Sequence, residues 1–321
     1  MGMVVVTLLW SCAGVVSRQL QSAESLEVTF FRSAFNFIAL AIALTAMRGV
    51  GLWKALPRLP GLVWVSGVCW SVMFTAFMSA LVMTRVANVL VTMAIGPLLT
   101  ALLARLVLQH RLPPRTWIAI VVAGAGIAWM FGNGVQAADS RSLVGMAIAL
   151  AVPLASSVNY TVLHKAGHAA SEGGGRGSSH DAAGGTVLPA AGAMTEPQDT
   201  QPDMLVAVLI GAALSALVAL PFAWPFHASG RDLAWLAGLG VFQLAIPCLL
   251  LVRLTRLLPS AEISLLGLLE TIFGVLWAWL GAGEQPGAAA LVGGALVIGA
   301  LAGNELLSLR PSAVSHARVL P

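Results

Sequence analysis

The 321-residue chain has the composition of a membrane protein and not that of a soluble one. Hydrophobic residues make up 58% of it and charged residues only 9%, whereas soluble domains carry about 25% charged residues. A soluble chain so poor in charge has too few polar side chains to cover its surface, so lipid is the expected covering. The net charge of +4 does not indicate nucleic-acid binding, because the basic residues flank apolar runs, where they set membrane orientation.

Apolar runs of about 20 residues follow one another along the chain, and this is the length that crosses the hydrocarbon core as a helix. The sequence therefore predicts an all-α integral membrane fold with ten transmembrane helices. The first run lacks the basic n-region and the small-residue cleavage site of a signal peptide, so we expect it to be the first helix. Thr84 and Arg85 alone mark the turn between the third and fourth spans. The predicted spans are 3–20, 28–47, 61–82, 86–108, 115–134, 142–163, 204–224, 232–252, 260–282 and 287–307.

Lys and Arg residues near the span ends predict the orientation of the chain. When both termini are placed on one side, ten of these residues fall on that side and four on the other. The positive-inside rule then predicts cytoplasmic termini, and we expect a bacterial-type inner membrane. The ten are Arg48, Lys54, Arg58, Arg111, Arg115, Lys165, Arg253, Arg256, Arg310 and Arg318, and the four are Arg18, Arg85, Arg141 and Arg231.

One segment, residues 166–203, is rich in Gly, Ala, Ser and Pro. This composition cannot bury a core, so it predicts a flexible cytoplasmic loop. The spacing of the histidines in and beside this segment fits no standard metal site. The three cysteines, Cys12, Cys69 and Cys248, each lie inside an apolar run and are interpreted as small hydrophobic residues. We expect no metal and no other cofactor.

An internal similarity relates the two halves of the chain. With Ala87 set against Ala261, an offset of 174 residues, the segment 85–110 aligns with 259–284 without a gap. A weaker match sets Gly2 and Met3 against Gly145 and Met146. The alternative is a chance alignment of two apolar helical hairpins.

Five spans in each half is an odd number, so the second half must enter the membrane inverted relative to the first. Inverted repeats are typical of secondary transporters, which bind their substrate near the midplane between the halves. We therefore expect two five-helix repeats, the second of which contains the 166–203 loop, followed by a cytoplasmic tail. Their predicted ranges are 1–134, 142–307 and 308–321.

The order and spacing of short motifs carry a family resemblance. The motifs are Leu9-Trp10-Ser11 in the first span, Phe31-Arg32 in the second, Ala87 through Gly96-Pro97 in the fourth, Leu269-Glu270 in the ninth and Gly283-Glu284 at its end. Together they resemble the drug/metabolite transporter superfamily, specifically its ten-helix EamA branch. His110 stands where the first half of this family usually has Glu, and Thr271 where the second half usually has Pro. The resemblance implies a proton-coupled or facilitative carrier, usually an exporter of amino acids or other metabolites.

Two ionisable residues within the spans are candidate functional groups, because a charge at bilayer depth costs about 2.5–3.5 kcal/mol on insertion scales. Glu270 lies near the middle of the ninth span. It is either a protonatable carboxylate that couples protons to substrate or binds a substrate amine, or a neutral packing carboxyl. Arg32 has Asn36 one turn further on the same face. It either binds a substrate carboxylate or extends outward to pair with Glu27.

Neutral polar residues complete the predicted pathway, each with helix packing as the alternative. Asn88 and Thr92 share a helical face that leads to Pro97, which can kink the helix. Gly299-x-x-x-Gly303 is a small-residue packing motif that serves either the fold or a homodimer. The remaining candidates are Trp10, Ser11, Trp70, Ser71, Asn159, Tyr160 and Gln243.

These observations predict a secondary transporter that exports small metabolites, such as amino acids or drug-like compounds, by alternating access. Its predicted partners are a small-molecule substrate and the lipid bilayer, with protons as the candidate coupling ion, a homodimer as the candidate assembly and no nucleic acid. One alternative is an intramembrane enzyme, which the sequence disfavours because no intramembrane catalytic motif occurs in it. The other is a non-transporting assembly or receptor protein, and the only long loop is of low complexity.

Overall fold

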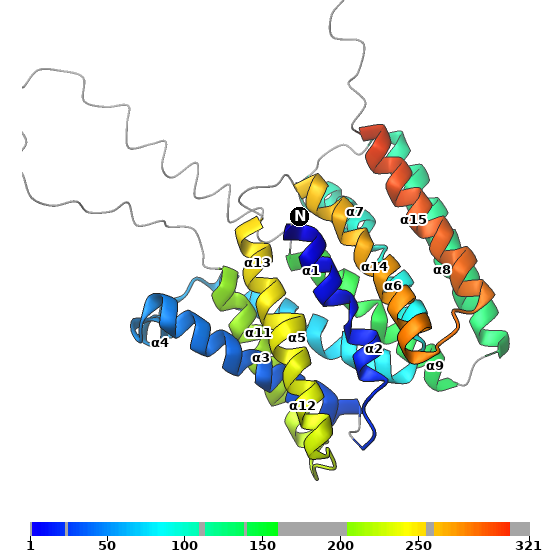
Figure 1. Cartoon of the computed structure of the whole chain (residues 1–321). Coiled ribbons are helices and arrows are strands. Elements are labelled where there is room, and N and C mark those ends of the chain that lie inside the picture. Colours follow the sequence, from blue (N-terminus) through cyan, green and yellow to red (C-terminus); the bar gives the residue numbers. More distant parts are fainter. Residues whose placement is uncertain are drawn as a thin grey trace, which may run out of the picture.

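The computed structural model describes residues 2–22, 25–108, 113–137, 140–159, 204–254 and 260–308. Every secondary-structure element in these ranges is helical (Figure 1). Five described helices are long and apolar enough to cross a membrane, and each overlaps a predicted span: Leu26–Arg48, Gly61–Met83, Ser140–Asn159, Leu205–Ala223 and Gly230–Leu251. Five shorter apolar helices overlap the other predicted spans: Gly2–Ser17, Val86–Thr100, Pro114–Trp129, Leu269–Ala282 and Ala288–Asn304.

The N-terminal elements run from α1 to α8. In chain order they are α1 (Gly2–Ser11), α2 (Ala13–Ser17), α3 (Ser25–Arg48), α4 (Gly51–Ala55), the 3-10 turn η1 (Leu56–Arg58), α5 (Gly61–Met83), α6 (Val86–Met93), α7 (Gly96–Leu108) and α8 (Pro114–Ala137). The turn at Thr84 and Arg85 separates α5 from α6 as predicted.

The C-terminal elements begin with α9 (Ser140–Ala149), after which residues 151–159 are also helical. They continue with α11 (Met204–Ala223), α12 (Gly230–Gly238), the π-helical segment η2 (Leu239–Ala245), α13 (Ile246–Leu254), α14 (Ser260–Ala282) and α15 (Ala288–Ser308). In Figure 1, α1 begins and α15 ends at the same end of the bundle. The predicted loop 166–203 and tail 308–321 lie outside the described residues, apart from Ser308.

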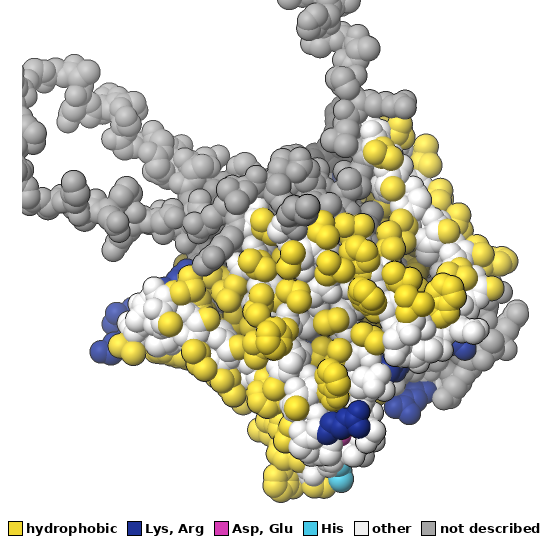
Figure 2. Space-filling view, in the orientation of Figure 1, with side chains coloured by type: hydrophobic (Ala, Val, Ile, Leu, Met, Phe, Trp, Pro, Cys, Tyr) yellow, Lys and Arg dark blue, Asp and Glu magenta, His cyan; other side chains and the backbone are white. Residues whose placement is uncertain are grey.

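Hydrophobic side chains cover much of the face of the bundle seen in Figure 2, and the Lys and Arg on this face lie toward its margins. The exposed set includes Ile42, Val121, Leu217, Phe222 and Leu280, while Ser, Thr, Asn, Gln and Arg side chains are buried inside. A soluble protein avoids large exposed apolar patches. The reversed distribution fits a bundle that faces hydrocarbon on the outside and keeps its polar groups among the helices.

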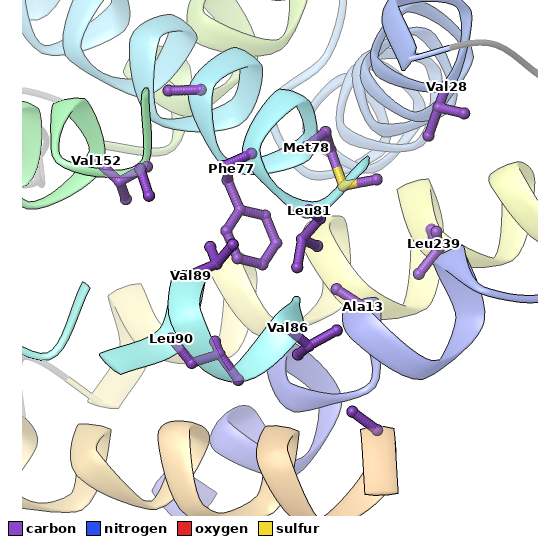
Figure 3. Packing of buried hydrophobic residues seen from close by; sticks show 14 of the residues in the cluster. Ala13, Val28, Phe77, Met78, Leu81, Val86, Val89, Leu90, Val152 and Leu239 are labelled. Carbon is purple, nitrogen blue, oxygen red and sulfur yellow. The ribbon is translucent and has the colours of Figure 1, made fainter. Parts of the chain in front are cut away.

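One apolar core joins the two halves of the chain (Figure 3). Phe77 and Leu81 of α5 pack there with Val86 of α6, and the C-terminal half contributes Val152 and Leu239. α15 packs along α8, α11 packs against both α5 and α3, and α14 packs against α1 and α6. The halves therefore interleave and do not form separate bodies.

Several predicted spans are interrupted where the sequence analysis expected continuous helices. The first breaks at Cys12, between α1 and α2, and the fourth at residues 94–95, between α6 and α7. The eighth contains η2. Pro97 and Pro247 lack the N–H that would bond to the carbonyl four residues earlier, which explains the second and third interruptions. At the first, the Ser11 Oγ donates to Leu8 O at 2.8 Å and the Cys12 Sγ to Leu9 O at 2.9 Å, and such bonds to helix carbonyls bend helices.

The Gly299-x-x-x-Gly303 motif does not pack against another described helix. A Cβ built on either glycine would meet no atom within 4 Å among the described residues. The close approach of α15 to α8 instead occurs at Gly126, where a Cβ would lie 2.9 Å from Gly293 O. The homodimer alternative for the motif stays a prediction.

Candidate functional site

Arg32 lies at the meeting point of four elements and is 1% exposed. It belongs to α3, and its Nε and Nη2 donate to Gln243 Oε1 of η2 at 3.1 and 2.8 Å. Its guanidinium carbon lies 5.6 Å from the ring centre of Phe77 in α5. The Gln243 amide in turn donates to Trp10 O of α1 at 3.3 Å. The structure therefore brings together three predicted site residues: Arg32, Gln243 and Trp10.

Arg32 does not extend outward to pair with Glu27, which is one of the two alternatives for this residue. Arg32 points into the bundle, where Gln243 accepts its hydrogen bonds. Glu27 instead accepts the backbone N–H groups of His227 and Ala228 at 2.8 and 2.6 Å. The sequence could not decide between its two alternatives for Arg32, because it does not reveal that an amide acceptor, 211 residues away in the chain, faces Arg32 inside the bundle.

The π-helical segment explains how Gln243 reaches Arg32. A π turn adds one residue to a helical turn and is frequent at functional sites. Gly240 in this segment lies against α3 so closely that a Cβ there would be 2.8 Å from Arg32 O. Since Pro247 has no N–H, the Gln243 carbonyl lacks its usual helical donor. The segment is thus close to α3 and free to depart from regular α-helical geometry.

Asn36, one turn after Arg32, is completely buried, and neither its Oδ1 nor its Nδ2 has a hydrogen-bond partner in the described part of the chain. The Nη1 of Arg32 is also buried without a partner. An unsatisfied buried polar group costs about 1–3 kcal/mol. Unpaired groups on one face of one helix mark a place where a polar ligand gains hydrogen bonds.

Glu270 belongs to the face of α14 that packs on the first span. Gly274, one turn later, faces Leu90 of α6 and the Ser11 carbonyl, and the Trp277 indole donates to Ser11 Oγ at 3.1 Å. By helical spacing, Glu270 shares this face and is partly buried. The predicted residues Ser11 and Glu270 are therefore associated with one helix contact, between α14 and α1.

Asn88 and Thr92 make local contacts away from Arg32. Asn88 Nδ2 donates to Thr84 Oγ1 at 3.1 Å, and Thr84 Oγ1 lies 2.6 Å from Ser142 Oγ. Thr92 donates to the Asn88 carbonyl at 2.7 Å. The Thr84–Ser142 contact joins the α5–α6 turn to α9, while the bonds of Asn88 and Thr92 lie within that turn and α6. Both residues thus make packing contacts, which is the alternative given for them.

The remaining candidates divide between packing positions and an unpaired group. Trp70 and Ser71 lie on α5 where α11 approaches, since a Cβ on Gly211 would clash with Trp70 Cβ. The Trp70 indole nitrogen is buried without a partner. Asn159 is 2% exposed, and its Oδ1 is likewise unpaired. Tyr160 lies outside the described residues.

Sequence reasoning missed a hydroxyl cluster between α3, α5 and α11. Ser215 Oγ lies 2.9 Å from Ser33 Oγ and 3.0 Å from Thr75 Oγ1. Single Ser and Thr residues in apolar spans are common, so only their spatial convergence distinguishes these three. Thr75 lies one turn after Ser71, but nothing in the spacing points to Ser215.

At the opposite end from the α1 N-terminus, an ion pair joins the two halves. Arg18 Nε lies 3.1 Å from Glu284 Oε2, and the Arg18 amino groups donate to Leu81 O and Thr84 O at 3.0 and 2.8 Å. Glu284 Oε1 accepts the Val86 N–H, at the start of α6, at 2.8 Å. The left-handed backbone of Gly283, with φ 64°, ends α14 and turns the chain just before Glu284. The Gly283-Glu284 motif thus has a structural role.

Comparison with known families identifies the chain. Residues 1–132 and 191–304 match the EamA-like transporter family. The chain belongs to this family. An EamA-like chain is a multi-pass membrane protein of a transporter family and not of an enzyme family, so the predicted resemblance to the drug/metabolite transporter superfamily is confirmed. No curated protein matches it.

A solved crystal structure shares the fold of this EamA-like protein. It aligns over 97% of this chain and 98% of the other, with a TM-score of 0.61 and 22% sequence identity. At this identity the likeness concerns the fold alone. Transport of a small molecule across a membrane is the function of the family.

Proposed function

We propose that this protein is a secondary transporter of ten transmembrane helices, built as two inverted five-helix repeats, that exports small metabolites by alternating access. Amino acids and drug-like compounds are the candidate solutes, and protons are the coupling ion. The observation that carries the proposal is that contacts between helices come in pairs related by exchanging the two halves. We place the protein in a bacterial-type inner membrane, with both termini cytoplasmic.

The paired contacts follow from numbering the spans one to five in each half. In the first half the five are α1–α2, α3, α5, α6–α7 and α8. In the second they are α9 with residues 151–159, α11, α12–η2–α13, α14 and α15. The contact of α1 with α14 has its counterpart in α9 with α6, and that of α1 with α13 in α9 with α5. The contact of α3 with η2 corresponds to that of α11 with α5, while α8 packs on its own counterpart, α15.

The weak sequence match of Gly2 with Gly145 also has a packing basis. A Cβ on Gly2 would lie 2.9 Å from Leu254 at the end of the eighth span, and one on Gly145 would lie 2.7 Å from Met83 at the end of the third. Each glycine thus opens a half and permits the same close approach to the equivalent helix. Chance alignment of apolar sequence gives no reason for this agreement.

Corresponding spans are also interrupted in both halves. The first breaks at Cys12, and the sixth has a turn at Leu150, where Pro153 leaves the Ala149 carbonyl without its donor. In secondary transporters, discontinuous helices at corresponding positions point to the binding site at the interface between repeats. Arg32, Gln243 and Trp10 lie beside the first of these interruptions.

Glu270 is the proposed proton-coupling carboxylate, because it is partly buried at the contact between α14 and α1. The Glu270→Gln variant keeps the shape and removes the titratable group. We expect it to lose the pH dependence of solute flux in proteoliposomes while inserting and folding normally. The Glu270→Asp variant, which keeps a carboxyl group, is expected to retain pH-dependent flux.

A flux assay with an imposed inward proton gradient, in both orientations of the protein, measures coupling and direction together. An unchanged pH profile in Glu270→Gln would remove Glu270 from the coupling mechanism. Wild-type vesicles in which the gradient drives no solute movement would contradict proton-coupled export, and facilitated exchange without a gradient would still show a carrier.

A further inference from the structure

The Arg32 guanidinium is a buried cation whose hydrogen-bond partner is neutral. It is 1% exposed, and the Gln243 amide oxygen accepts the hydrogen bonds of its Nε and Nη2. Among the described residues the ion pair joins Arg18 to Glu284, and no carboxylate lies within ion-pair distance of Arg32. Taking a charge out of water without a counter-ion is costly, so this position favours an anion.

Three of the described acidic residues have carboxylates that bind groups other than Arg32. Glu27 binds the backbone of His227 and Ala228, and Asp232 binds that of Gln21 and Ser22. Glu284 binds Arg18. Glu270 lies on α14, at its contact with α1. The missing negative charge is therefore not supplied by these side chains.

Free donors remain on one face of α3. The Gln243 oxygen accepts from Nε and from one Nη2 hydrogen of the guanidinium. The Nη1 hydrogens and the second Nη2 hydrogen are then the donors available to a ligand. Arg32 Nη1 and Asn36 Nδ2 are both buried and have no hydrogen-bond partner among the described residues, and the two residues lie one helical turn apart. Two nitrogens of one guanidinium match the two oxygens of a carboxylate, and the Asn36 amide adds a donor beside them.

We propose that Arg32 and Asn36 form the subsite that binds the carboxylate group of the transported solute, with Gln243 and Trp10 O as the positioning groups behind it. This inference rests on the proposed transport function and gives it a substrate class: small organic anions and zwitterions, and not purely cationic compounds. The break at Cys12 lies beside the subsite, which is closed in this conformation and opens during alternating access.

The test uses solutes that share one phenyl side chain and differ in their carboxylate, amide and amino groups, added to the purified full-length protein. The probes are phenylalanine, phenylalaninamide, 3-phenylpropionate and 3-phenylpropionamide, with chloride and inorganic phosphate as separate arms. A ligand that binds the folded state raises its thermal stability. We expect the two carboxylates to stabilise the wild type and to be transported, and the two amides and the inorganic anions to do neither.

Variants at Arg32 separate charge from geometry. Arg32→Gln is expected to weaken carboxylate binding at least tenfold. Arg32→Lys is expected to weaken it less, because lysine keeps the positive charge but lacks the planar pair of N–H donors of the guanidinium. Asn36→Leu tests the second donor and is expected to reduce carboxylate affinity severalfold. Arg105→Gln is the matched control, because Arg105 also lies in a span but stacks on Trp117 at 5.6 Å, and it is expected to bind as the wild type does.

Failure of the subsite and failure of transport give different results. Equal binding of the acids and their amides, equal binding of chloride or phosphate, or an Arg32→Gln protein that keeps the carboxylate preference would overturn the subsite while leaving a carrier. Failure of all four organic probes to bind a folded wild type would also count against it. Carboxylate binding that depends on Arg32 but comes with no flux would support the subsite and contradict the transport function.

Discussion

Gly240 determines how closely η2 approaches α3 and therefore whether Gln243 reaches Arg32. A Cβ at this position would lie 2.6 Å from Phe35 Cβ and 2.8 Å from Arg32 O, and neither neighbour is the movable end of a flexible side chain. Gly240→Ala is expected to destabilise the protein by about 1–3 kcal/mol, the usual cost of overpacking. Thermal unfolding of the purified variant measures this change.

Gly238→Ala is the matched control for Gly240, because a Cβ there would meet no atom within 4 Å. Alanine in a helix is favoured over glycine by about 0.8–1 kcal/mol. The control variant should therefore unfold at the same temperature as the wild type or at a higher one. Equal destabilisation of the two variants would show that contact with α3 does not decide the effect.

At the scale of single residues, the sequence predicts chemical types better than partners. Arg32, Gln243 and Glu270 are visible as polar groups in apolar spans, because burying them is costly. Their partners are not visible, since Arg32 meets Gln243 across 211 residues and Ser33 meets Ser215 across 182. Which polar residues meet depends on the order in which helices pack, and no local pattern encodes that order.

Arg18 of the first half and Glu284 of the second form an ion pair that links helices of the two halves. Glu284 pairs with Arg18 and accepts the N–H that opens α6, while Arg18 also binds the last carbonyls of α5 and its turn. The two side chains are 30% and 15% exposed, so solvent weakens the ion pair. We expect a coupling of about 0.5–1 kcal/mol between them, measured as the non-additivity of Arg18→Gln and Glu284→Gln in thermal unfolding.

Arg231→Gln serves as the control for this cycle, because Arg231 is an exposed arginine at the start of α12. Surface substitutions of this kind usually change stability by less than about 0.5 kcal/mol. Additive effects of the Arg18 and Glu284 variants, with no coupling, would contradict a tie between the halves at this point.

At the scale of whole helices, long apolar runs predict the positions of the spans, because the bilayer fixes the required length. Interruptions are harder to foresee. Those near Pro97 and Pro247 follow from a missing N–H, and the sequence flags both positions. The break at Cys12 has no proline beside it. It follows from the side-chain bonds of Ser11 and Cys12 to Leu8 O and Leu9 O, and the sequence does not show which Ser and Cys residues of a span make such bonds.

For the whole molecule, α3 separates two ends that should lie on opposite sides of the membrane. This helix has 24 residues, about 36 Å at 1.5 Å per residue. The loop before α12 binds its first turn through Glu27, and α4 with Lys54 follows its last residue. The charge bias predicts that Lys54 lies on the cytoplasmic side and Arg231 on the outer side.

Single cysteines at these two positions test the orientation of the protein and the crossing of the membrane together. In a variant whose three native cysteines are replaced by alanine, we expect a membrane-impermeant maleimide to label Arg231→Cys in intact spheroplasts. Lys54→Cys should react only after the membrane is permeabilised. The reverse labelling would invert the orientation but keep the fold. Labelling of both from outside would contradict the crossing by α3, and with it the odd number of spans per half from which the inverted repeat follows.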